Sequence, residues 1–287
     1  MYRNKDLEAK ALEAADFVGG RLSIAAGEIK TAVVLGTGWA EAIQIEDSRQ
    51  IDLENILGFE SLSNGSLTAI AGHDRMLICG HVGQSDNRVL FLKGRIHVNE
   101  SPSEPQLVMP LVRLQIEMLF QMGVRNLILT CAAGTIVWPI EVGDVVVIRD
   151  FVTSAGLILP LWAGEFCTPE DALDQRMANE ARSTSVPGLR IKYGTYAMQR
   201  GPHFEGRARD KENFRRDGAH VVGMSIVPEC ATSALYKDDG VKVAALAYIT
   251  NDWLEEHSHD ANRDRAKASS LKLGDFLSEY VDSVSKF

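Results

Sequence analysis

Short, wholly apolar segments alternate with amphipathic ones in the second half of the chain, and this alternation constrains the fold more than any other feature. The apolar segments predict β-strands over residues 126–131, 145–148, 191–198, 220–224 and 241–250. The spacing of apolar residues between and after them predicts helices over residues 169–182, 205–217, 228–237 and about 260–285. Strands that are apolar throughout must be covered on both faces. The sequence therefore predicts an α/β fold.

The first half adds further elements of the same kind. A helix is expected over residues 6–28 and another over 105–122, where a proline stands at the start and a glycine at the end. Strands are expected over residues 32–35, 67–71, 75–80 and 88–93. The chain contains no internal repeat, low-complexity tract or long linker. We therefore expect one domain over residues 1–287.

The composition excludes several classes of function. Lys and Arg number 30 against 39 Asp and Glu, which gives a formal net charge of −9 and disfavours a duplex nucleic-acid binder. No apolar run reaches the roughly 18–20 residues that a membrane span needs, and the N-terminal segment lacks the apolar region of a signal peptide. The cysteines are isolated from one another, which favours reduced thiols in a reducing, cytoplasmic compartment. They are Cys79, Cys131, Cys167 and Cys230.

Three strand ends in the first half carry residues suited to an anion. Gly36-Thr37-Gly38 offers backbone amides and a hydroxyl, although a plain tight turn is the alternative. Arg95 and His97 lie two residues apart after an apolar strand, and a guanidinium with an imidazole suits a phosphate. A surface salt bridge is the alternative for that pair. The small residues of 130–135 allow close backbone approach or simple packing.

The remaining strand ends suit a heterocyclic base. Phe204 and Glu205 offer an aromatic face beside a carboxylate acceptor, and Met224 offers a soft apolar wall. Ser225 lacks the surrounding glycines of a nucleophile elbow, so its hydroxyl is interpreted as a hydrogen-bond donor. Asn251 presents a donor and an acceptor after a long apolar run. Core packing, a cap or a turn is the alternative for each of these residues.

A histidine-rich segment near the C-terminus is the one stretch that suggests a metal. His257-Ser258-His259-Asp260 carries ligand-type side chains, but no partner cluster is found elsewhere in the sequence. We therefore interpret it as a solvated loop with at most one functional histidine, and we expect no metal.

Taken in order, several segments from about residue 30 to the C-terminus resemble the trimeric purine nucleoside phosphorylase and methylthioadenosine phosphorylase family. They are VVLGTG, GRIHVNE, LTCAAGTI, EVGDVVVIRDF, GTYAMQRGPHFEGRA, VVGMSIVPE and AYITN. The GPHFE and GMSIVPE segments, at their observed spacing, are the specific ones. The resemblance implies a single domain with a mixed, twisted central β-sheet covered by helices.

The resemblance also implies the roles of individual residues. The phosphate site would consist of Thr37, His73, Arg95, His97, the Ala132 amide and Ser225. The nucleoside would be bound by Phe204, Glu205, Met224, Asn251, Asp252 and His257. His97, Asn251 and Glu205 would be the catalytic residues. Either His257 or His259 would meet the ribose 5′ position, with His257 preferred.

The implied activity is phosphorolysis of purine (deoxy)nucleosides in purine salvage. The expected substrates are 6-oxopurine nucleosides such as inosine and guanosine, with inorganic phosphate as co-substrate and no cofactor. The products would be the free base and (deoxy)ribose 1-phosphate. The family further implies a homotrimer, in which the loop around 156–168, with Phe166 as the candidate, reaches a neighbour's site. No nucleic-acid or membrane partner is expected.

Two departures from the family pattern keep alternatives open. Cys131 stands where the purine members usually have Asn, and Asn99 stands where they have a Tyr against the ribose. These departures motivate a non-catalytic paralogue that binds a nucleoside or phosphate. Asp252 motivates the other alternative, a methylthioadenosine phosphorylase-like enzyme that acts on 6-aminopurine nucleosides. A nucleosidase that uses water is less favoured, because Arg95 and His97 suit phosphate.

Overall fold

The computed structural model of the protein describes residues 2–63, 65, 67–70, 73–83, 86–153, 157–204, 209–253 and 259–287, with only the backbone for 259–263. Within these ranges the chain forms a nine-stranded mixed sheet. The strands run in the order β2 (Glu46–Asp52), β3 (Met76–His81), β4 (Val89–Lys93), β1 (Thr31–Leu35), β5 (Asn126–Thr135), β8 (Val221–Gly223), β7 (Ile191–Met198), β6 (Val145–Val152) and β9 (Lys242–Asn251).

The second half of the sheet closes on itself. β9 lies at the end of the strand order, yet it also pairs in parallel with β5 from Asn126 opposite Lys242 onward. The strands β5, β8, β7, β6 and β9 therefore form a ring, while β1, β4, β3 and β2 extend from β5 as an open wing. β1 is parallel to both β4 and β5, so the carboxyl ends of β1, β4, β5 and β9 face the same edge.

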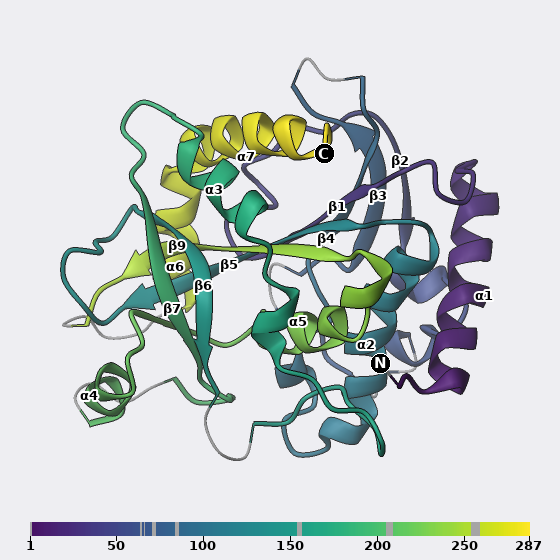
Figure 1. The fold of residues 1–287 in the computed structure, drawn as a ribbon, viewed down its shortest axis with the longest axis horizontal. Helices are drawn as coiled ribbons and strands as arrows, with labels where there is room; N and C mark the ends of the chain where they lie inside the picture. Colours follow the sequence, from purple (N-terminus) through teal and green to yellow (C-terminus); the bar gives the residue numbers. More distant parts are fainter. Residues whose placement is uncertain are drawn as a thin grey trace.

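Helices cover both faces of this sheet (Figure 1). The helices of one layer are α1 (Lys5–Leu22), α2 (Pro105–Gln121) and α5 (Val227–Ala234), whose buried residues belong to one core cluster. Those of the other layer are α3 (Gln175–Ser183), α6 (His259–Ala268) and α7 (Ser270–Val284), which contribute to a second cluster. The remaining helix is α4 (Arg209–Arg216). The predicted α/β fold with a mixed, helix-covered sheet is confirmed.

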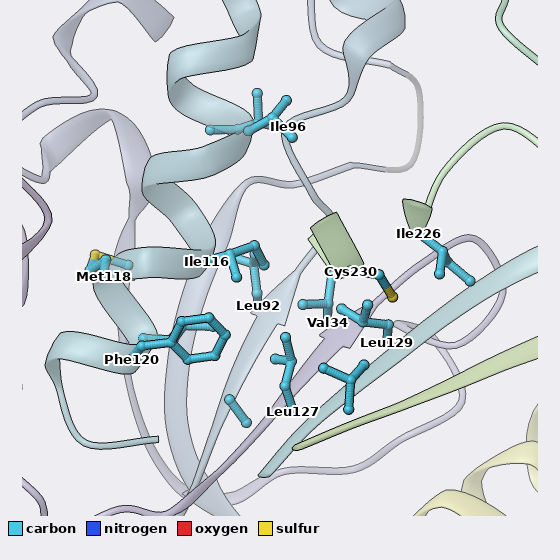
Figure 2. Close-up of a cluster of buried hydrophobic side chains, with 14 of the residues drawn as sticks. Val34, Leu92, Ile96, Ile116, Met118, Phe120, Leu127, Leu129, Ile226 and Cys230 are labelled. Carbon is cyan, nitrogen blue, oxygen red and sulfur yellow. The ribbon is translucent and has the colours of Figure 1, made fainter. Parts of the chain in front are cut away.

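Strand β1 shows why both layers are needed. Val34 packs into the cluster that contains Ile116 and Phe120 of α2, as Figure 2 shows. Its neighbours Val33 and Leu35 point the other way, into the cluster that contains Phe276 of α7. Each such side chain contributes roughly 1.5–3 kcal/mol when it is fully removed from water. The alternation of side chains along a strand thus divides one apolar run between two cores.

Several element boundaries differ from the sequence-based expectation. Residues 67–70 are irregular, so the strand predicted over 67–71 is wrong for the described part of that range. Strand β2 was not predicted, because its mostly exposed sequence EDSRQID shows no apolar pattern. The first helix ends at Leu22, since Ser23 adopts a left-handed φ of 54°. The segment over 169–182 divides into a 3₁₀ turn, Pro169–Ala172, and α3.

The C-terminal helix is also interrupted. Helical structure is interrupted at Ser269, so two helices, α6 and α7, stand where a single helix was expected over about 260–285. Of the helix expected over 205–217, the described part is α4, which starts at Arg209. Among the described residues, no helix is both long and apolar enough to cross a membrane.

Candidate active site

A cavity of about 290 Å³ opens where several strands end, on the edge shared by β1, β4, β5 and β9. It is lined by all the residues expected at the phosphate site, namely Thr37, His73, Arg95, His97, Ala132 and Ser225. Phe204, Met224 and Asn251 from the expected base site line the same cavity. The structure thus brings together side chains that are up to 214 residues apart in the sequence, from Thr37 to Asn251. This edge is where ligands bind in open α/β sheets.

The glycine turn after β1 is fixed from two sides. The Gly36 amide donates to Thr130 Oγ1 at 3.0 Å, and a Cβ on Gly36 would lie 2.4 Å from the Thr130 carbonyl oxygen. On the other side, a Cβ on Gly38 would lie 2.1 Å from the Ala266 Cβ of α6, and Gly38 has a φ of 83°. Glycine is therefore required at both positions, and the turn presents Thr37 to the cavity.

Arg95 lines the cavity as one half of a buried ion pair. The side chain is 2% exposed, its Nη1 donates to Glu229 Oε1 at 2.7 Å, and its Nη2 donates to the Thr130 carbonyl. The Glu229 carboxylate is equally buried. A pair of this kind loses most of its hydration, so the two charges depend on each other. The surface salt bridge considered from the sequence is wrong, since both partners are buried.

His97 is a neutral hydrogen-bond donor. Its Nδ1 accepts from the Asn99 amide at 3.0 Å, so the proton of the neutral ring is assigned to Nε2. Burial holds the pKa of His97 well below its usual range, and the nearby His73 and Arg95 lower this pKa further. The two imidazoles meet edge to face with centroids 6.0 Å apart. His73 Nδ1 lies 2.8 Å from the Arg95 carbonyl, to which it must donate.

Two buried side chains that the sequence reasoning missed hold the Arg95–His97 loop. Gln115 on α2 brackets the backbone of Ile96: its Oε1 accepts from the Ile96 amide at 2.8 Å, and its Nε2 donates to the Ile96 carbonyl at 3.1 Å. Glu100 accepts from the His97 amide at 3.1 Å and also pairs with Arg75. The loop is therefore positioned by polar groups that lie behind the cavity.

Asn251 is held at the end of β9, where it lines the cavity. It is buried, and a Cβ on Gly134 of β5 would lie 2.6 Å from its Nδ2, so a glycine is needed beside it. Arg265 of α6 donates to the Thr250 carbonyl at 2.7 Å and fixes the adjoining backbone. Phe204, which is 39% exposed, lies at the cavity as well.

The other residues predicted to bind the nucleoside do not appear among the described residues of the cavity lining. Asp252 follows Asn251 directly but is not among the described residues that line the cavity, and its predicted contact with the nucleoside stays a prediction. Glu205 and His257 lie outside the described residues, as does the side chain of His259. Among the described residues, no group of three or more His, Cys, Asp or Glu side chains is arranged to hold a metal ion.

The two departures from the family pattern both line the cavity. Burial raises the pKa of the Cys131 thiol to about 12, against an opposing effect of Arg95, so this thiol is protonated at neutral pH. Asn99 Oδ1 is buried without a hydrogen-bond partner among the described residues. A Cβ on Gly201 would lie 2.3 Å from Asn99 Nδ2, so that side chain packs directly on the backbone before Pro202.

Known proteins share this architecture along almost the whole chain. The model of the phosphorylase superfamily matches residues 30–282. The purine nucleoside phosphorylase of Mycobacterium tuberculosis is 30% identical over 280 residues, which cover 96% of this chain and 97% of that protein. The rat purine nucleoside phosphorylase is 29% identical and covers 79% of this chain and 81% of its own length.

Solved structures show the same fold. Isoform 2 of the Schistosoma mansoni purine nucleoside phosphorylase, in complex with cytosine and ribose-1-phosphate, superposes with a TM-score of 0.79 at 24% identity and covers 96% of each chain. A schistosome purine nucleoside phosphorylase in complex with hypoxanthine gives 0.78 at 21% identity, with 96% of this chain and 97% of that chain covered. On the family match and the 30% identity together, this chain belongs to the phosphorylase superfamily, among the pentosyltransferase enzymes known as purine nucleoside phosphorylases.

Proposed function

We propose that the protein catalyses the phosphorolysis of 6-oxopurine (deoxy)nucleosides to the free base and (deoxy)ribose 1-phosphate. The observation that carries this proposal is the cavity of about 290 Å³, in which the donors expected for phosphate and the side chains expected for a purine lie together. The names of the relatives support the same reaction. Inorganic phosphate serves as co-substrate, and no metal or organic cofactor takes part in the proposed reaction.

The chemical difficulty of the proposed reaction is that opposite charges develop on the two sides of the bond that breaks. As the N-glycosidic bond breaks, C1′ of the sugar develops positive charge while the purine leaves as an anion. Thr37, His97, Ser225 and the Ala132 amide would hold the phosphate as hydrogen-bond donors, and Arg95 would add a positive charge. The phosphate then attacks C1′ and stabilises the cation before the new bond is complete.

The departing base is stabilised from the opposite side. The Asn251 amide would donate to N7 or to the 6-oxo oxygen, and its burial strengthens such a hydrogen bond relative to one in water. Glu205 would accept from N1–H. Phe204 and Met224 would pack against the purine faces.

The proposed base class depends on the residue at the purine edge. A 6-aminopurine would need a carboxylate such as Asp252 there, and Asp252 does not line the cavity, which favours a 6-oxopurine. The ribose 5′ contact is assigned to either His257 or His259, with His257 preferred.

We also propose a homotrimer in the cytoplasm. Phe166 is 82% exposed, although both of its neighbours are anchored. Glu165 is buried and accepts a bidentate pair of hydrogen bonds from Arg113, and Cys167 Sγ donates to the Ala231 carbonyl at 3.3 Å. A large aromatic side chain held in solvent by a fixed backbone is suited to the site of a neighbouring subunit. Size-exclusion chromatography with light scattering measures the subunit number.

Base release measured by absorbance tests the proposed reaction. Inosine, guanosine, adenosine and methylthioadenosine are each incubated with the enzyme, with and without inorganic phosphate. Phosphate-dependent cleavage of inosine and guanosine supports the proposal. Cleavage of methylthioadenosine alone would move base recognition to a 6-aminopurine, and cleavage without phosphate would indicate a hydrolase. Binding of phosphate and inosine without any base release would support the non-catalytic paralogue suggested by Cys131 and Asn99.

A further inference from the structure

The backbone directly after Ser225 is strained. Ile226 has a φ of 73° and a ψ of −52°, and the Val227 amide donates to the Ser225 carbonyl at 2.9 Å. This is a γ-turn of the rare positive-φ type, which is unfavourable for a β-branched residue. Strained backbone persists only where the surroundings hold it on more than one side, and it is concentrated at functional sites. The question is what holds Ser225 in the orientation that lines the cavity.

One side of the turn is held by the core. The Ile226 side chain is completely buried in the same cluster as Val34 and Cys230, as Figure 2 shows. The following residues start α5 at once, with Pro228 in its first turn. This packing fixes the residues that follow Ser225.

Tyr196 of β7 holds the other side. Its Oη accepts from the Ser225 amide at 3.1 Å. The ring is completely buried and packs edge to face on Phe151, with centroids 6.2 Å apart and planes at 89°, so the oxygen has a fixed position. A Cβ on Gly223 would lie 2.3 Å from Oη, so the adjacent strand β8 has a glycine at the point where the hydroxyl passes.

The same hydroxyl interacts with side chains of the cavity. The side chains of Ser225 and Cys131 lie next to this hydroxyl, and both influence its pKa. Burial raises the pKa of Tyr196 well above its usual range, so the phenol keeps its proton. A phenol oxygen that accepts from the Ser225 amide still has one proton to donate. If that proton goes to Ser225 Oγ, the Ser225 proton is left to point into the cavity.

We infer that Tyr196 is a positioning residue of the phosphate site: its hydroxyl accepts from the Ser225 amide and donates to Ser225 Oγ, and it thereby directs the Ser225 proton to the bound phosphate. Tyr196 itself does not line the cavity. The inference rests on the proposed function for the identity of the anion. Tyr196, a buried residue of β7, would thus act on the phosphate through Ser225.

Tyr196→Phe tests this role because it removes the hydroxyl and keeps the ring. Tyr280→Phe is the matched control: Tyr280 is also completely buried, and its Oη donates to the Met177 carbonyl at 3.0 Å in the opposite helix layer. The Kd of inorganic phosphate is measured by isothermal titration calorimetry, and the KM of phosphate by inosine cleavage. We expect Tyr196→Phe to weaken phosphate binding by about tenfold. Tyr280→Phe should stay within about twofold of the unmodified protein, even if its Tm falls by the same amount.

A double-mutant cycle separates positioning from general destabilisation. In a Ser225→Ala background, Tyr196→Phe should change phosphate affinity by less than about twofold, because the hydroxyl it orients is gone. If Tyr196→Phe cannot be purified, Gly223→Ala perturbs the same oxygen and should weaken phosphate binding in the same way. Unchanged affinity in either variant, or an undiminished loss in the Ser225→Ala background, would overturn the inference. Because calorimetry needs no turnover, a lack of inosine cleavage would contradict only the proposed reaction.

Discussion

The buried pair of Arg95 and Glu229 leads to a quantitative prediction. In Glu229→Gln the new amide oxygen can still accept from Arg95 Nη1, but the guanidinium charge loses its counter-ion. Two unit charges about 4 Å apart interact by about 4 kcal/mol at an effective dielectric constant of about 20. Removing one partner of a buried pair typically costs about 3–5 kcal/mol. Both side chains here are 2% exposed, so solvent screens little of this interaction.

We therefore expect Glu229→Gln to lower the free energy of unfolding by about 3 kcal/mol, since the retained hydrogen bond places the cost at the lower end. For a chain of this size that loss lowers the Tm by roughly 6–12 °C. We further expect inorganic phosphate to raise the Tm of the variant more than that of the unmodified protein. A bound dianion replaces the missing carboxylate as the counter-charge of Arg95.

Thermal unfolding by circular dichroism, with and without phosphate, measures both effects. Glu28→Gln is the control, because Glu28 pairs with Arg88 at 2.9 Å on the surface, where the side chains are 38% and 30% exposed. Exposed pairs contribute little, so this variant should unfold close to the unmodified protein. If Glu229→Gln also unfolded at an unchanged Tm and gained no more from phosphate, the dependence of Arg95 on Glu229 would be refuted.

Three further predictions concern the cavity. Asn251→Ala should lower kcat on inosine by about 10²–10³-fold with little change in KM, and a change confined to KM in steady-state assays would contradict its role at the leaving base. Because the pKa of His97 is depressed in the folded state, mildly acidic pH protonates this residue in the unfolded state but not in the folded state. Stability should therefore fall as the pH drops below about 6.5, and pH-dependent urea titrations should show a shallower fall in His97→Gln. Cys131, with a pKa of about 12, should resist alkylation by iodoacetamide at pH 8 in the native protein. Rapid alkylation of Cys131, detected by mass spectrometry, would contradict the assigned burial.

The parts of the site that could be predicted from the sequence share one property, which is a local pattern at the end of an apolar strand. Thr37 stands between two glycines, and Arg95 and His97 follow such a strand directly. The structure brings all three to the cavity. Asp252 shows the limit of this reasoning, because adjacency to Asn251 alone does not tell whether a side chain lines the cavity, and Asp252 is not among the described residues that do.

The missed residues have no local pattern. Gln115 lies within a buried helix, and its sequence position is typical of any helical residue. Its side-chain Oε1 and Nε2 nevertheless both hydrogen-bond with the Ile96 backbone. Glu229 is 134 residues from Arg95 along the chain, and only the closed sheet brings the two together. In the fold, β2 escaped prediction for a related reason: it is an edge strand, stabilised by pairing with β3 rather than by an apolar face.

The site consists of groups that line the cavity and buried groups behind it, and both departures from the family pattern are in the first set. Gln115, Glu100, Glu229 and Tyr196 lie behind the cavity. The last three bind the cavity-lining residues His97, Arg95 and Ser225, and Gln115 binds the Ile96 backbone between Arg95 and His97. Asn99 and Cys131 line the cavity itself. A substitution at such a cavity-lining position alters the contacts offered to a ligand, while the loops behind the cavity stay in place. We therefore expect a substitution of Asn99 or Cys131 to change which ligands the cavity holds, and a substitution of the buried groups behind them to disturb the loops that line it.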